Sequence, residues 1–170
     1  MRLRLDRLAS PIGVVLLVTD DDGALRALDF EDYVTRMLTL LERHYGAVEL
    51  PNGAAPKPTR QALDAYFKCD LEALASVRVA TGGSPFQRQV WAALRTIPAG
   101  ATMSYGQLAT KLARPSASRA VGLANGANPI AVVVPCHRVI GADGALTGYG
   151  GGIDRKRWLL EHERRNSALA

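Results

Sequence analysis

The sequence lacks any long apolar run, which limits what the protein can be. No hydrophobic stretch approaches the roughly 20 residues that a membrane-spanning helix needs. At the N-terminus the leucines are interrupted by Arg2, Arg4, Asp6 and Arg7, so this segment does not form the apolar core of a signal peptide. We therefore expect a cytoplasmic protein without a membrane partner.

Cysteine is also scarce. The two cysteines, Cys69 and Cys136, show no CxxC or zinc-type spacing, so we expect free thiols and no bound metal. Cys69 lies in a helical pattern beside charged residues and is interpreted as a small filler at a helix edge. The chain has no GxGxxG after a strand, no P-loop lysine and no internal repeat, and we expect no cofactor.

The composition is that of an ordinary globular protein. The 170 residues are 48% hydrophobic and 22% charged, which is enough for one sizeable core or two small domains. The net charge of +5 and the pI near 9.6 suit a polyanionic partner. Many basic proteins bind no nucleic acid, so charge alone permits DNA binding without showing it.

The first third of the chain alternates between apolar and polar residues, as strands do. Three such runs predict a small antiparallel meander: residues 3–9, 13–19 and 24–30. Helices are predicted over residues 31–45, ending at Gly46, and over 59–68, with a further strand over 77–80. Residues 1–80 therefore predict an N-terminal α/β domain.

The segment Thr81-Gly82-Gly83 is the predicted linker. Its two glycines precede Ser84-Pro85, which is typical of a helix cap and a first-turn proline. An amphipathic helix is predicted over residues 84–96. Residues 84–170 then form a mainly helical C-terminal domain, and the fold class is α+β.

Two short helices follow within this domain. Ser104 can cap a helix over residues 105–112, and Ser118 can cap another from 119 to about 126, which suggests a helix-turn-helix. Plain core packing is the alternative interpretation. The second helix has few side chains that reach base edges in a major groove, so close backbone approach to a minor groove is the more plausible mode of DNA binding.

The chemistry centres on Cys136. An apolar run of strand type, residues 130–134, leads to it, and charge on His137 or Arg138 would favour the nucleophilic thiolate. Successive residues of a strand point to opposite faces, so Cys136 and His137 need a backbone bend or a bridging water to interact. Taken alone, the Cys-His dipeptide is explained as well by a structural role.

The segment Pro135–Ile140, PCHRVI, matches the active-site hexapeptide of the O6-alkylguanine-DNA alkyltransferases, also called methylated-DNA–protein-cysteine methyltransferases. The chain resembles this family over residues 84–163, and only loosely over the first 80 residues. The other matching segments, in order, are Phe86–Trp91, Ser104-Tyr105, Arg119–Gly122, Asn128-Pro129, Gly148–Gly152 and Trp158–Glu163.

The resemblance implies that Cys136 accepts an alkyl group directly from O6 of guanine in a single, irreversible turnover. It implies that Glu163 orients His137, which takes the thiol proton through a water. Tyr105 is implied to donate a proton to the guanine as the alkyl group leaves. His162, like His44, is interpreted as an ordinary surface or packing histidine.

The resemblance also implies that the damaged nucleotide is flipped out of the duplex, because O6 lies within the base stack. Arg119 is then the finger that takes the place of the flipped base, and Asn128 supports the turn before the active-site strand. The remaining residues implied to hold the base or close the pocket over it are Cys136 and Val139 through their main chains, Tyr149, Gly150 and Gly151.

The implied partner is double-stranded DNA that carries O6-alkylguanine, with O4-alkylthymine expected as a second substrate. We expect a monomer in solution, and clustering on DNA stays open. Some relatives carry serine where this chain has Gly150, so a hydroxyl that could contact the guanine O6 is absent here.

Two other functions stay open at this stage. A cysteine hydrolase that uses Cys136, His137 and Glu163 would turn over repeatedly on an ester or amide. A non-enzymatic module that only flags alkylated DNA, as relatives without the cysteine are thought to do, would bind the damage and leave it unaltered. The presence of Cys136 and Arg119 favours the alkyltransferase.

Overall fold

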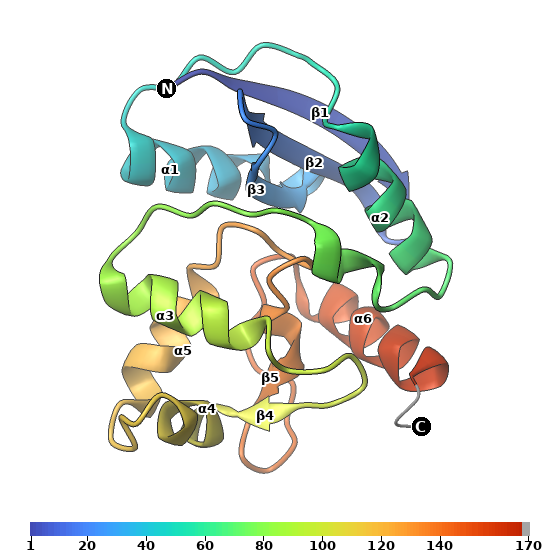
Figure 1. Ribbon diagram of the computed structural model, residues 1–170. Helices are drawn as coiled ribbons and strands as arrows, with labels where there is room; N and C mark the ends of the chain where they lie inside the picture. Colours follow the sequence, from blue (N-terminus) through green and yellow to red (C-terminus); the bar gives the residue numbers. More distant parts are fainter. Residues whose placement is uncertain (168–170) are drawn as a thin grey trace. The chain divides into compact units, whose positions relative to one another are not determined.

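The structure, a computed structural model, describes residues 1–167. The chain divides into two compact units (Figure 1). The first contains residues 1–82 together with 129–133, and the second contains residues 83–128 and the chain from 134 onward. No helix among the described residues is both long and apolar enough to cross a membrane.

The first unit is built on an antiparallel sheet with the order β1-β2-β3. Strands β1 (Leu3–Ser10) and β2 (Gly13–Asp20) form a hairpin, and β3 (Leu25–Phe30) pairs with the other edge of β2. In the turn before β3, Asp20 accepts hydrogen bonds from the main-chain N–H of Asp22 and Ala24. The predicted meander is confirmed.

Helix α1 (Val34–Tyr45) contacts β3 and covers one face of this sheet (Figure 1). It follows a 3-10 turn, Glu31–Tyr33, and ends at Gly46, whose φ of 73° lies in the left-handed region that glycine tolerates. The core between sheet and helix contains six buried side chains, Leu3, Leu16, Val18, Ala27, Met37 and Leu41. The predicted helix over residues 31–45 is thus confirmed.

Helix α2 (Lys57–Phe67) contacts β1, and a 3-10 turn, Ala73–Ser76, follows it. The strand predicted over residues 77–80 is wrong. Only Val79 forms an isolated bridge, to Leu25, because Leu25 N–H donates to the Arg78 carbonyl and the Ala80 N–H to the Leu25 carbonyl. The single bridge from Val79 to Leu25 of β3 is too short to form a strand.

The second unit begins with α3 (Pro85–Leu94), which has a complete capping box. The Gln87 N–H donates to Ser84 Oγ at 3.1 Å, and the Ser84 N–H donates to Gln87 Oε1 at 3.0 Å. The indole N–H of Trp91 then donates to the Ala124 carbonyl at 2.8 Å, which fixes α3 against α5. The predicted cap and helix are confirmed.

Helices α4 (Tyr105–Lys111) and α5 (Ser118–Gly126) pack against each other as the predicted helix pair. Ser104 caps α4 with a second capping box, as expected. Ser118 is not a cap: Ala117 holds the N-cap position of α5, without a side-chain hydrogen bond. The unit ends with α6 (Ile153–Asn166) and also contains a two-stranded parallel sheet, β4 (Met103–Ser104) with β5 (Val139–Ile140).

Residues 130–134, predicted as a strand that leads to the cysteine, are not a strand. Ile130 forms a single parallel bridge to Leu28, and Val132 then takes a φ of 70°, which breaks the extended conformation. All five residues are at most 4% exposed, so the apolar run reflects the burial of this segment and does not indicate a strand.

Candidate functional site

The nucleophile lies on a tight turn in the second unit. Residues Cys136–Arg138 form a short 3-10 helix after Pro135, and β5 begins directly after it. Cys136 is a free thiol and is 6% exposed. Because the chain is helical here and not extended, the expected alternation of Cys136 and His137 between opposite faces does not apply.

His137 is fixed by a carboxylate from the last helix. Its Nε2 lies 2.8 Å from Glu163 Oε2, and the two side chains are 0% and 1% exposed. The other ring nitrogen, Nδ1, is buried and has no hydrogen-bond partner among residues 1–167. A carboxylate at Nε2 favours a proton on that nitrogen, which leaves Nδ1 as the acceptor available to a neighbouring thiol or water.

Arg138 completes the cluster around the carboxylate. Its Nε donates to Glu163 Oε1 at 2.8 Å and its Nη2 donates to Glu163 Oε2 at 2.9 Å, the bidentate geometry of a strong ion pair. Its Nη1 donates to the Ile97 carbonyl at 2.6 Å. Burial alone would raise the pKa of Glu163, but the charge and hydrogen bond of His137, with those of Arg138, hold that pKa far below its ordinary value. Glu163 is therefore a carboxylate near neutral pH.

Two buried amides connect the helix pair to the nucleophile's turn. Asn128, 1% exposed, donates from Nδ2 to the Val134 carbonyl at 2.8 Å. Asn125 on α5, 3% exposed, donates from Nδ2 to the Cys136 carbonyl at 3.4 Å. The first contact lies in the turn for which the sequence predicted support by Asn128, and the second was not anticipated.

Tyr105 approaches the site through the small parallel sheet. Met103 pairs with Val139 and Ser104 with Ile140, so the first residue of α4 lies beside the chain that leaves the nucleophile's turn. The Tyr105 hydroxyl lies 2.7 Å from Thr147 Oγ1. Val139, whose main chain was predicted to hold the base, is completely buried.

Lys156 on α6 is an unexpected member of the site. It is 0% exposed, and its Nζ donates to the Val139 carbonyl at 2.7 Å and to the Thr147 carbonyl at 2.8 Å. Burial lowers the pKa of Lys156, and the nearby Cys136 opposes this shift by raising it. A buried ammonium group within electrostatic reach of the thiol favours its ionised form.

The DNA-side residues lie on α5 and on the loop before α6. Arg119 is exposed in the first turn of α5 and has no ion pair or hydrogen bond among residues 1–167. Tyr149 is half-buried, and its carbonyl accepts from the Gly152 N–H at 3.0 Å, which curls the glycine-rich segment. Gly150 is half-buried and Gly151 is buried within this segment.

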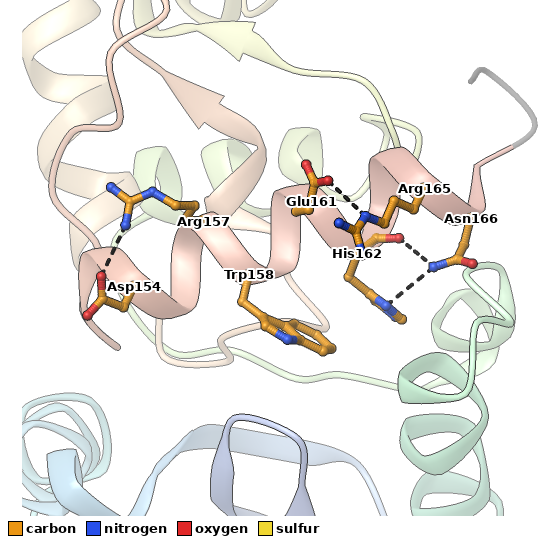
Figure 2. Close-up of a pocket in the computed structure, with 7 residues that line it drawn as sticks. All are labelled: Asp154, Arg157, Trp158, Glu161, His162, Arg165 and Asn166. Carbon is orange, nitrogen blue, oxygen red and sulfur yellow. Dashed lines mark hydrogen bonds and ion pairs between the residues drawn. The ribbon is translucent and has the colours of Figure 1, made fainter.

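A separate hollow lies along α6 and is lined by Asp154, Arg157, Trp158, Glu161, His162, Arg165 and Asn166 (Figure 2). Its walls include the rings of Trp158 and His162, which stack with their centroids 4.6 Å apart. His162 is thus a packing residue, as expected. The hollow is lined by no cysteine, serine or threonine, and no group of three or more His, Cys, Asp or Glu within residues 1–167 could hold a metal ion.

A buried thiol, a histidine–carboxylate pair and an adjoining helix-turn-helix define a thiol-dependent protein of α+β fold with a nucleic-acid-binding motif. Comparison with known proteins identifies it further. The 6-O-methylguanine DNA methyltransferase family matches through its ribonuclease-like domain over residues 4–81 and its DNA binding domain over residues 85–165. The chain belongs to the methylated-DNA–protein-cysteine methyltransferase family.

Relatives and solved structures agree with this assignment. The methylated-DNA–protein-cysteine methyltransferase of Salmonella typhimurium is 51% identical over 165 residues, which are 96% of each chain. The structure of Mycobacterium tuberculosis OGT in complex with DNA has a TM-score of 0.80 and 42% identity, over 98% of this chain and 95% of that one. The O6-methylguanine-DNA methyltransferase of Pyrococcus kodakaraensis has a TM-score of 0.71 and 25% identity, over 95% and 98% of the two chains.

The structure brings several of the predicted residues together. His137 and Glu163 are in direct contact, and Tyr105 is connected through Thr147 and Lys156 to Val139. The functions of Arg119 and Tyr149 stay predictions. Sequence reasoning missed Asn125, Thr147 and Lys156, and it did not anticipate that Arg138 binds Glu163.

Proposed function

We propose that this protein repairs DNA by transferring the alkyl group of O6-alkylguanine in duplex DNA to its own Cys136. The observation that carries the proposal is the buried Cys136-His137-Glu163 arrangement, in a chain that belongs to a family of protein-cysteine methyltransferases. The proposed partner is double-stranded DNA, and the M. tuberculosis OGT structure, a complex with DNA, supports DNA as the partner. O4-alkylthymine is proposed as a second substrate.

The proposed reaction begins with the thiol proton. His137 Nδ1 takes it through a water, while Glu163 at Nε2 stabilises the imidazolium that results. The thiolate then attacks the alkyl carbon, and the carbon–oxygen bond to guanine breaks as the carbon–sulfur bond forms. Tyr105 donates its hydroxyl proton to the departing base, so that the guanine leaves as its normal neutral form.

The product explains why one molecule repairs one lesion. A thioether on Cys136 offers no carbonyl carbon to water, whereas the thioester of a cysteine hydrolase does. The 6% exposure of Cys136 also restricts access of solvent. The protein is therefore proposed to be consumed in a single turnover, without a cofactor.

The substrate must leave the base stack to reach a buried thiol, so we propose that the nucleotide is flipped. Arg119, exposed on α5, is proposed to fill the space that the base leaves. The main chains of Cys136 and Val139 hold the base, and the loop through Tyr149, Gly150 and Gly151 closes over it. Binding of the protein as a monomer is the simplest arrangement for a single flipped base.

The first test is mass spectrometry of the protein after incubation with limiting duplex DNA that carries one O6-methylguanine. We expect one methyl group on the peptide with Cys136 for each guanine restored, and none on Cys136→Ser. An unmodified protein with untouched DNA would contradict transfer and favour a module that only binds damage. Repeated loss of substrate without labelling would favour a hydrolase.

A further inference from the structure

Thr147 has no assigned role, yet its hydroxyl is the group that contacts the proposed proton donor. Its Oγ1 lies 2.7 Å from the Tyr105 hydroxyl, a normal length for a hydrogen bond between two hydroxyl groups. Thr147 itself is exposed and lies on the loop before α6. An exposed threonine on a loop stays at this distance only if other contacts hold its main chain in place.

Those contacts come from the buried Lys156. Its Nζ donates to the Thr147 carbonyl and to the Val139 carbonyl, so one ammonium group ties the loop to β5. Lys156 is 0% exposed, and a buried ammonium that lost a carbonyl partner would carry a large desolvation cost. The loop is therefore pinned at the residue whose side chain meets Tyr105.

The position of the Tyr105 ring is already set by other contacts. Tyr105 follows Ser104, which is paired with Ile140, and its ring flanks Gly122, where an added Cβ would lie 3.6 Å from it. What these contacts leave undetermined is the direction of the phenol O–H bond. A hydrogen bond from Thr147 to the phenol oxygen would turn that proton away from Thr147.

We propose that Thr147 is a positioning residue for alkyl transfer, an inference that rests on the proposed function. Its hydroxyl donates to the Tyr105 oxygen, so the Tyr105 proton points to the base. As the carbon–oxygen bond breaks and the carbon–sulfur bond forms, the electron pair passes to the guanine, which takes the Tyr105 proton. The Thr147 hydrogen bond supports the phenol oxygen while that proton leaves, and the oxygen regains a proton from water.

The test compares two substitutions in the full chain. Thr147→Val keeps the shape and removes the hydroxyl, whereas Thr147→Ser keeps the hydroxyl. We expect Thr147→Val to slow the single-turnover transfer of methyl from duplex DNA about fivefold to tenfold, the usual effect of one lost hydrogen bond. Thr147→Ser should restore the rate, and the affinity for the DNA should be the same for both.

A double-mutant cycle separates positioning from a merely structural role. In a Tyr105→Phe background the phenol is gone, so Thr147→Val should cause no further slowing. Equal slowing in both backgrounds, or a wild-type rate for Thr147→Val, would overturn the inference. A wild-type protein that transferred no methyl group would instead overturn the proposed function itself, so the two failures are distinguishable.

Discussion

Asp29 in the first unit and Glu163 in the second are both 1% exposed, and both bind an arginine. Asp29 Oδ2 lies 2.9 Å from Arg36 Nη1, and its Oδ1 accepts from the Phe30 N–H. Glu163 accepts two hydrogen bonds from Arg138 and also contacts His137. Both carboxylates are buried and bind an arginine, and Glu163 also contacts the imidazole of His137, a group that can carry a proton.

A buried ion pair does not by itself identify a catalytic site. At Asp29 the ion pair connects the end of β3 to α1. At Glu163 the charge and hydrogen bond of His137, with those of Arg138, hold the pKa low, so the carboxylate stays ionised and can stabilise an imidazolium. What distinguishes the Glu163 site is its second partner, His137, whose other ring nitrogen is available to accept a proton.

The largest expected effect separates the two carboxylates by activity. Glu163→Gln keeps the shape but removes the charge that supports the His137 imidazolium, so we expect methyl transfer to slow by about 100-fold or more. Asp29→Asn should leave the rate unchanged. Rapid-quench measurement of single-turnover transfer checks both, and equal slowing by the two substitutions would show that Glu163 has no special role in the reaction.

The next effect concerns stability. Glu163→Leu leaves Arg138 buried without its carboxylate, and the free energy of unfolding should fall by about 3–5 kcal/mol. Glu161 on the same helix is the matched control, because its hydrogen bonds to Arg164 and Arg165 are exposed to solvent. Urea denaturation should show no change in midpoint for Glu161→Gln. A wild-type midpoint for Glu163→Leu would refute the importance of the buried cluster.

Acid should reveal a smaller difference between the units. The pKa of Glu163 is far below its ordinary value of 4.5, so below pH 4.5 the unfolded chain binds a proton that the folded chain does not. The stability that this group contributes is complete above that pH and is lost progressively as the pH falls.

The pKa of Asp20 in the first unit is also lowered, despite its burial, by Arg26 and by main-chain N–H groups. The free energy of unfolding should decrease as the pH falls from neutral to 3. We expect Glu163→Gln to reduce this decrease more than Asp20→Asn does. Denaturation at a series of pH values measures this, and the reverse order would contradict the assignment of the larger shift to Glu163.

The smallest expected effect concerns DNA affinity. Arg119→Ala should weaken binding to duplex DNA and reduce the slope of log affinity against log salt by about 1, because one positive charge is lost from the DNA-binding surface. Arg43→Ala, an exposed arginine in α1, should change neither quantity. Fluorescence anisotropy at several salt concentrations measures both variants. If Arg119→Ala and Arg43→Ala had the same slope, the DNA would not bind at Arg119.

Periodicity and caps predicted most of the fold. The meander, α1 and the capped helices α3 and α4 follow from local patterns that the structure does not override. The prediction of a strand over residues 130–134 was wrong because a fully buried irregular segment has the same apolar sequence pattern as a buried strand. Only the bridge of Ile130 and the positive φ of Val132 show that the chain turns there.

Only those site residues that belong to a recognisable sequence motif could be predicted. Cys136 and His137 are adjacent in sequence, and Glu163 was reached through the family resemblance. Thr147 and Lys156 left no signal, because Lys156 binds main-chain carbonyls and these depend on the fold and not on residue type. A lysine on a helix is ordinarily solvated, so its burial was not foreseeable.

The grouping of residues 129–133 with the first unit has a consequence for how the protein can be divided. The Leu28 N–H donates to the Pro129 carbonyl and the Ala131 N–H to the Leu28 carbonyl, so β3 is bonded to a segment that lies five to seven residues before Cys136. A fragment that begins at Gly83 would carry this buried segment without its hydrogen-bonding partners. Neither unit is therefore encoded by a contiguous piece of the gene. Split versions of the protein that cut the chain at residues 81–83 would separate residues 129–133, which lead to Cys136, from the strand β3 to which they are hydrogen-bonded.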